Sequence, residues 1–340
     1  MKIVLILAGT LFLSGCAGAL NLSRYAERDL DNRTVSYELP QYIKGKKKPK
    51  VAVLPFSDTT QFGKSANLSQ VAQESLTQLI VENCGVEVVE RAQIEGFMQE
   101  MKLQSGITGE MDAEKFMSIA KDVDMVFVGA ISSAVATHRF KEGKSWTDKK
   151  GKQHYIQPSC TEMANVAINF RALASPSGTI QQVFQTRGRK SFSREVGSSA
   201  ECRVQNPGAL LSEAIANAID DSREALIDAF PALGYIYKTM TGKNDPRNRI
   251  AFINLGKADG VEPGNRIDII EFVREKDRVK GNDKVITRVI AEGVVSETDL
   301  QPEGSILLIP EDAADRIFVG QAVRTKANMN FIRSLRKSLR

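Results

Sequence analysis

The sequence predicts two domains: an α/β layer with a mixed sheet and packed helices, followed by a small domain built mainly of β-strands. Short apolar strands alternate with helix-like periodicity through the first half of the chain, which is typical of an α/β layer. Short strands separated by glycine turns follow beyond residue 246, which is typical of a small barrel. About 290 residues remain after the polar N-terminal segment, enough for two domains of ordinary size.

The first residues have the composition of a secretory signal peptide. One positive charge, Lys2, precedes an apolar run at 3–12, which is too short to cross a bilayer as a helix of about 20 residues. Small side chains at 14–15, as a signal peptidase requires, come directly before Cys16. This arrangement is a lipobox. We therefore expect a signal peptide at 1–15 and, on Cys16, a thioether-linked diacylglycerol with an N-acyl chain such as palmitate. An ordinary signal peptide with an incidental cysteine is the alternative.

The residue after the cysteine and the overall charge indicate where the chain works. Ala17 stands where aspartate usually marks inner-membrane retention, so we expect the periplasmic face of the outer membrane in a host with two membranes. The chain has 46 Lys and Arg against 41 Asp and Glu, and removal of 1–15 takes away only Lys2, which leaves a net charge near +4. So mild a charge argues against a nucleic-acid partner. Residues 16–48 are polar and weakly periodic and predict an acylated tether.

The α/β domain is expected over residues 49–234. The segment 124–131 is nearly all apolar, as a central strand covered on both faces should be. The segment 162–174 alternates apolar and polar side chains, and a Ser-Pro-Ser-Gly turn at 175–178 joins it to the next strand. The expected strands are 51–55, 86–89, 124–131, 162–174 and 179–192, and the expected helices are 68–81, 94–101, 113–121 and 209–230.

The second domain is expected over residues 247–327. Its five short strands, with their glycine turns, favour a small SH3-like or similar β-barrel and lie at 249–255, 266–273, 285–296, 305–309 and 321–325. The tail at 328–340 is basic and amphipathic, which predicts contact with a partner or an anionic membrane; packing on the body of the protein is the equal alternative. The residues of this candidate contact are Phe331, Arg333, Leu335, Arg336, Lys337 and Leu339.

The sequence contains no motif of a known catalytic chemistry. It has no HExxH, GxSxG, CxxC or phosphate-binding GxxxxGK[ST] motif. The two histidines, His138 and His154, lie in a polar region around 139–157 that we expect to be a loop and that holds the only tryptophan, Trp146. We therefore predict that the protein is not an enzyme and has no metal or cofactor apart from its lipid.

Three cysteines remain besides Cys16. Cys160 and Cys202 flank the predicted hairpin of two long strands, and folding it at 175–178 brings them together, so they are the expected disulfide pair in an oxidising compartment. Cys84, at a helix end before a buried strand, would stay a buried thiol. A zinc site formed by the hairpin cysteines and the two histidines is the alternative, with a spacing that matches no zinc module.

Four short motifs resemble, in their order along the chain, those of CsgG-family proteins. They are VAVLPFSD at 51–58, VVER at 88–91, SG at 105–106 and MVFVGAI at 125–131. This family comprises outer-membrane lipoproteins, including the curli secretion channel, and shares its core with the N-terminal domain of TolB and with lipoprotein activators of penicillin-binding proteins. The resemblance covers about residues 49–230 plus the lipobox. In addition, NLGKADGVEPG at 254–264 looks like the SH3-like end domain of FlgT, a flagellar basal-body ring protein.

The resemblance implies a ring oligomer, and in curli channels each subunit gives two hairpins to a transmembrane barrel. The corresponding segments here are 132–161 and 187–206. A membrane strand needs about 9 to 11 residues with every second side chain facing lipid. Residues 137–157 carry charges in both registers, and 187–205 has only isolated apolar residues. Each charge near the middle of the bilayer costs about 2–4 kcal/mol, so these hairpins argue against a curli-type pore.

We therefore expect an outer-membrane lipoprotein that forms a homo-oligomeric ring and acts in the assembly or transport of a secretion or surface-appendage machine, such as a curli- or flagellum-like system. Its partners would be other periplasmic or outer-membrane proteins. A true curli-type export channel is one alternative. The other is a monomeric regulator of a peptidoglycan synthase, which a tether of about 30 residues, roughly 100 Å when fully extended, would let reach across the periplasm.

Overall fold

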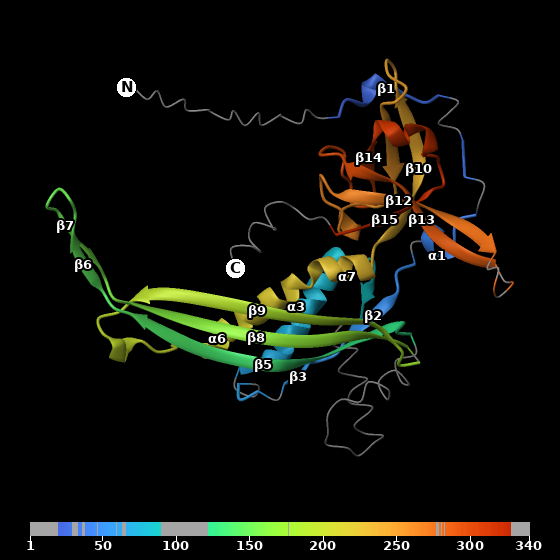
Figure 1. Cartoon of the computed structure of the whole chain (residues 1–340). Helices are drawn as coiled ribbons and strands as arrows, with labels where there is room; N and C mark the ends of the chain where they lie inside the picture. The colour runs from blue at the N-terminus through green and yellow to red at the C-terminus, as the bar shows by residue number, and fades with distance from the viewer. Residues whose placement is uncertain are drawn as a thin grey trace, which may run out of the picture.

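The computed structural model describes residues 20–327, apart from 29–32, 36–37, 46, 59, 63–65, 90–121, 176, 277–278, 280 and 282. The predictions for Cys16, for the helices at 94–101 and 113–121, and for the tail at 328–340 lie outside the described residues. Figure 1 shows two parts: an elongated α/β part, in which three long strands run side by side, and a C-terminal part set against one end of it.

The α/β part is built on a mixed sheet with the strand order β4-β2-β5-β8-β9. Its strands are β2 (Lys50–Val53), β3 (Ser57–Asp58), β4 (Glu87–Val88), β5 (Met125–Lys141), β8 (Ser159–Ala174) and β9 (Ile180–Glu195). β2 runs parallel to both β4 and β5, and the short β3 pairs with β5. β8 is antiparallel to its neighbours β5 and β9. The predicted mixed α/β sheet is thereby confirmed.

Helices cover one face of this sheet (Figure 1). They are α3 (Leu68–Asn83), α6 (Pro207–Asp221) and α7 (Arg223–Ala229). Asn206 is the N-cap of α6, and its Oδ1 accepts a hydrogen bond from the backbone N–H of Ala209 at 3.0 Å. The helix lies so close to β9 that a Cβ on Gly188 would be 1.9 Å from the carbonyl oxygen of Ala214. Among the described residues, no helix is both long and apolar enough to cross a bilayer.

β5 continues much farther than the sequence predicts, whereas β8 and β9 each pass their expected outer ends by only three residues. β5 extends ten residues past the expected end at 131, and the expected loop at 139–157 contains a hairpin of β6 (Lys144–Thr147) and β7 (Gln153–Ile156). We call β5, β8, β9 and this hairpin the arm. Most side chains of β5 beyond residue 134 are exposed, so no apolar alternation marks the outer part of the strand.

The C-terminal part is a closed antiparallel sheet, here called the barrel. Its strands are β10 (Leu233–Gly242), β11 (Arg249–Ile253), β12 (Arg266–Lys276), β13 (Asp283–Val295), β14 (Ser305–Ile309) and β15 (Ala322–Thr325), with short 3-10 helices η4 (Lys257–Asp259) and η5 (Glu311–Arg316). The order β10-β11-β14-β13-β12-β15 closes because β10 also pairs with β15. The first domain is expected to run to residue 234 and no strand is expected at β10, but β10 belongs to the barrel, so the boundary lies before Leu233. The likeness to SH3-like domains stays a prediction.

Much of the segment predicted as a tether packs on the barrel. It forms η1 (Leu22–Arg24), β1 (Tyr25–Ala26), which pairs with β10, and α1 (Gln41–Lys44). The Tyr25 hydroxyl donates to Asn248 Oδ1 at 2.9 Å, 223 residues away, and Ile43 is fully buried beside Ile270. Local periodicity does not reveal these contacts because the segment has few apolar residues and each packs against a distant strand.

The two parts meet closely at two glycines. A Cβ on Gly85 would lie 2.4 Å from the backbone of the segment leading into β10. One on Gly260, at a φ of +74°, would lie 2.8 Å from the carbonyl oxygen of Glu82 at the end of α3. The ammonium of Lys48 also pairs with the buried carboxylate of Asp259 at 3.1 Å. A largely apolar cavity of about 480 Å³ lies at this junction.

Candidate functional site

The arm is the candidate functional site because one of its faces is buried and the other is open. In β8, even-numbered side chains from Cys160 to Phe170 are buried, whereas Asn165, Asn169 and Arg171 are exposed. Residues paired across neighbouring strands share a face, so the register of β5, β8 and β9 assigns each side chain to one face or the other. The open face consists of the odd-numbered positions of β8 and their partners.

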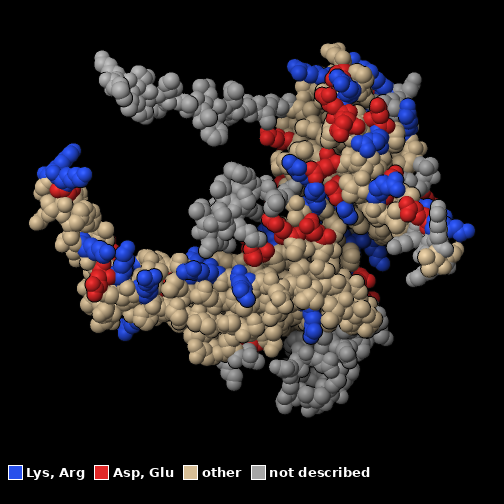
Figure 2. All heavy atoms as spheres, in the orientation of Figure 1, with Lys and Arg blue, Asp and Glu red and all other residues tan. Residues whose placement is uncertain are grey.

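Four arginines line this open face, and no carboxylate lies between them. Arg139 on β5, Arg171 on β8, and Arg187 and Arg189 on β9 are all exposed. Among the described residues none of the four forms an ion pair with a carboxylate; Arg189 instead donates to Met163 Sδ at 3.1 Å. Figure 2 shows basic side chains spaced along the arm and gathered at its tip. We call this surface the arginine face.

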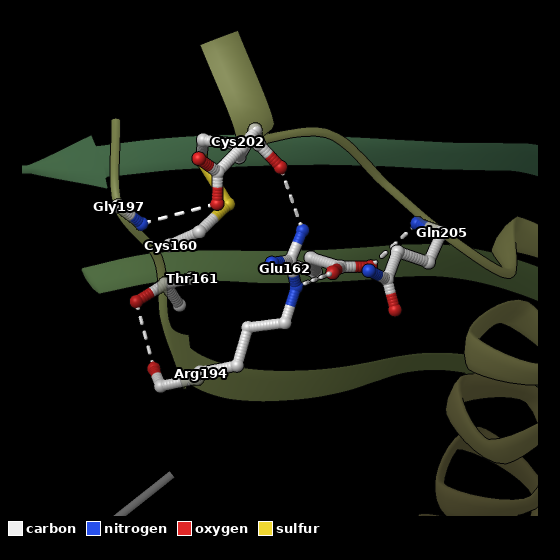
Figure 3. The surroundings of a disulfide bond; sticks show 9 residues. Cys160, Thr161, Glu162, Arg194, Gly197, Cys202 and Gln205 are labelled. Carbon is white, nitrogen blue, oxygen red and sulfur yellow. Dashed lines mark hydrogen bonds and ion pairs between the residues drawn. A yellow bond between two sulfur atoms is a disulfide. The ribbon is translucent and has the colours of Figure 1, made fainter. Parts of the chain in front are cut away.

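A disulfide and a buried ion pair tie the segment at 196–206 back to the arm (Figure 3). Cys160 and Cys202 are bonded, with their Cα atoms 5.2 Å apart. Glu162, two residues after Cys160 on β8, is only 5% exposed. Its carboxylate accepts hydrogen bonds from Arg194 Nε–H at 3.1 Å and from the backbone N–H of Gln205 at 2.8 Å. Covalent and ionic contacts together therefore hold this loop against the outer half of the arm.

Sequence reasoning predicts the cysteine pair but misses the ion pair beside it. Arg194 Nη2 also donates to the carbonyl oxygen of Glu201, so its guanidinium joins two strands and a loop. The available signal is the alternation of β8: Glu162 is the one charged residue in a row of buried apolar positions. A carboxylate in such a row requires a buried cation or several donors, because burying it alone is costly.

The β6–β7 hairpin at the tip carries an aromatic stack. The rings of Trp146 and His154 lie 5.1 Å apart at an interplanar angle of 14°, and His154 Nε2 is 3.1 Å from Asp148 Oδ2. The hydrogen bond from His154, aided by the backbone N–H groups of Lys152 and Lys150, lowers the pKa of Asp148 below its ordinary value. Sequence reasoning expects a loop here and does not predict this stack.

The outer surface of the helix layer is acidic. The only cation on α3, α6 and α7 is Arg223, which binds Asp220 at 2.7 Å. Another acidic residue, Glu213, pairs at 2.5 Å with Lys190, which reaches over from β9. We call this surface the acidic face; its carboxylates are Glu74, Glu82, Glu213, Asp220, Asp221, Glu224 and Asp228.

The structure does not bring the alternative zinc ligands together. His138 is paired with Glu162 across β5 and β8, His154 lies in the tip hairpin, and the two cysteines bond to each other. In the described ranges no group of three or more His, Cys, Asp or Glu side chains is placed to hold a metal ion. Cys84 is a buried free thiol whose pKa burial raises to about 12, against a smaller lowering by Arg223.

Comparison with known proteins gives one family. The family model of the curli production assembly/transport component CsgG matches residues 33–234. No curated protein matches the chain.

Several solved structures are similar to about half of the chain. The lipoprotein GNA1162 from Neisseria meningitidis is 16% identical, with a TM-score of 0.27, over 51% of this chain and 99% of that one. The hypothetical protein CT253 from Chlamydia trachomatis is 12% identical, with a TM-score of 0.27, over 53% and 98%. A PelC dodecamer from Paraburkholderia phytofirmans is 13% identical, with a TM-score of 0.23, over 51% and 87%.

Proposed function

Because the chain belongs to the CsgG family, whose model matches more than half of its length, we propose that it is a non-enzymatic assembly or transport component that works as a homo-oligomeric ring. The ring would lie on the periplasmic face of the outer membrane, held by acyl chains on Cys16. It would serve a secretion or surface-appendage machine and bind other periplasmic or outer-membrane proteins of that machine.

The observation that carries this proposal is the arm. Its strands are 16 and 17 residues long, about 50 Å at roughly 3.3 Å per residue, and within the described ranges no helix or strand covers the open face. The disulfide and the Glu162–Arg194 pair hold the outer half of the arm together. A stiff sheet that projects from a packed body is suited to build contacts with neighbouring subunits or partners.

The N-terminal contacts place the barrel close to the proposed lipid anchor. The amide of Leu20 donates to Thr298 Oγ1 at 3.2 Å, and β1 pairs with β10 immediately afterwards. Leu20 comes only four residues after Cys16 in the sequence, so at most about 14 Å of chain lies between them. This short link supports a protein held at the membrane surface. A segment packed on the barrel does not support a long free tether, on which the alternative of a periplasm-spanning regulator of a synthase depends.

An export channel is the second candidate, and the length of the arm favours it. Strands of 16 and 17 residues exceed the 9 to 11 or so that span a bilayer. Against this, exposure of the arginine face to lipid would cost about 2–4 kcal/mol for each charge near the middle of the membrane. Lys190 and Arg194 on β9 add charge on the other face. We therefore favour a scaffold over a pore.

The test is the size and shape of the acylated protein purified in mild detergent. Light scattering should give the mass of several chains, and negative-stain electron microscopy should show closed rings. A homogeneous monomer would contradict both the scaffold and the channel. Conductance of the rings in a planar bilayer would favour the channel, and rings without conductance would favour the scaffold.

A further inference from the structure

We propose that neighbouring subunits join head to tail, with the arginine face of one copy packed on the acidic face of the next. This inference rests on the proposed ring and specifies the surfaces that build it. Both faces belong to the same α/β layer, and they lie on opposite sides of it, since the helices cover the side of the sheet that the arginines do not occupy (Figure 1). A second copy of this chain is therefore the partner.

The arginine face lacks the internal neutralisation that is usual at a protein surface. Between the strand positions of Arg139 and Arg171, the open-face side chains other than the four arginines are uncharged. Two of them, Val135 and Val183, are 45% and 55% exposed. The face therefore combines unneutralised cations with exposed apolar area. That combination is typical of a surface that is covered in an assembly.

The acidic face is opposite in charge to the arginine face. It carries carboxylates on all three helices and a single arginine. Glu82 of α3 is exposed, and the neutral side chain of Gln78 donates a hydrogen bond to its carboxylate at 2.8 Å. Val81, the residue before Glu82 on α3, is 58% exposed and supplies apolar area. Opposite potentials on two surfaces of one molecule favour a heterologous contact between copies.

The symmetry and the size of the contact agree with a ring. A two-fold dimer through either face would place arginine against arginine or carboxylate against carboxylate, which like-charge repulsion opposes. A head-to-tail contact avoids this and closes into a ring when the rotation between subunits allows. Three strands about 50 Å long and about 5 Å apart present roughly 700 Å², close to the 800 Å² or so per partner in a standard interface.

Charge reversal on one face at a time tests the proposal on the full acylated chain in mild detergent. The first variant is Arg187→Glu/Arg189→Glu, and the second is Glu74→Lys/Glu82→Lys/Glu224→Lys. We expect each variant alone to lose the ring and run as a monomer. An equimolar mixture should form rings of alternating chains, because the two intact faces can pair with each other and the two reversed faces can do the same. Combining all five changes in one chain should restore the ring.

The control is Lys149→Glu/Lys150→Glu, which makes a charge change of the same size as the first variant at the tip of the arm, and it should keep the ring. Matched thermal unfolding of all variants excludes misfolding. Rings that persist in either single-face variant would overturn this inference and leave the proposed function intact. Monomers that fail to pair in the mixture would overturn it as well. A monomeric wild-type protein would refute the proposed ring itself.

Discussion

Removal of the disulfide should destabilise the α/β part by an amount that its loop length sets. The bond closes a loop with a sequence separation of 42 residues, for which the chain-entropy relation gives about 4 kcal/mol at 25 °C. The variant Cys160→Ala/Cys202→Ala should therefore lower the free energy of unfolding by about 4 kcal/mol, within the usual range of 2 to 5. Both cysteines are buried, so a small loss of packing adds to the effect.

Urea unfolding followed by the fluorescence of Trp146 measures this effect, since the only tryptophan lies on the arm. The matched control is Cys84→Ala, which truncates a buried thiol that forms no disulfide. Reduction of the wild-type protein by a thiol should reproduce the shift of the double variant. A decrease below about 1 kcal/mol, or one equal to that of the control, would show that the bond adds nothing beyond its packing. A matching shift in the barrel, followed by hydrogen exchange, would refute its assignment to the arm.

Three further changes test the packing and the titration of the α/β part. Gly188→Ala places a Cβ against the backbone of α6 and should lower stability by about 1–3 kcal/mol in urea unfolding, whereas Ala216→Ser on the exposed side of α6 should not. The pKa of Asp148 is lowered in the folded hairpin, so the stabilising effect of its carboxylate is fully present above the ordinary pKa of 3.8 and is lost as the pH falls through the lowered pKa. The anisotropy of tryptophan fluorescence should drop in this acidic range, and Asp148→Asn should remove the transition. With a pKa of about 12 and a buried side chain, Cys84 should resist alkylation at pH 8 until the protein unfolds, and labelling of the native protein would contradict this.

The inner half of the α/β part follows from local patterns in the sequence. The strand at 51–53, the helix from Leu68, and the buried start of β5 are apolar runs or stripes that packing on the sheet requires, and the match to the CsgG model at 33–234 confirms the family. The outer half of the arm lacks such a pattern along β5, whose side chains beyond residue 134 are mostly exposed, and its stability comes from pairing along the ladder and from the loop at 196–206 that the disulfide holds against it.

Contacts between distant segments account for the other differences. β10 continues directly from the helical region, and its pairing with β11 and β15 follows from closure of the barrel. Tyr25 and Ile43 are isolated apolar residues in a polar segment, and each is buried by a strand that comes more than 200 residues later. The arginine face likewise requires the register of three strands, because charges fall on both alternations when one strand is read alone.

The charge of β9 decides between two ways in which the arm can join other chains. A 16-residue strand at the edge of a sheet invites pairing with another strand, and proteins limit this with charged side chains. β9 carries Arg187, Arg189, Lys190 and Arg194 within eight residues. In addition, the side-chain amide of Asn217 on α6 donates a hydrogen bond to the backbone carbonyl oxygen of Arg189. Two of these cations, Arg187 and Arg189, lie on the open face and make it complementary to a carboxylate-rich helix layer. Face-to-helix packing therefore uses the charges that edge pairing would have to overcome.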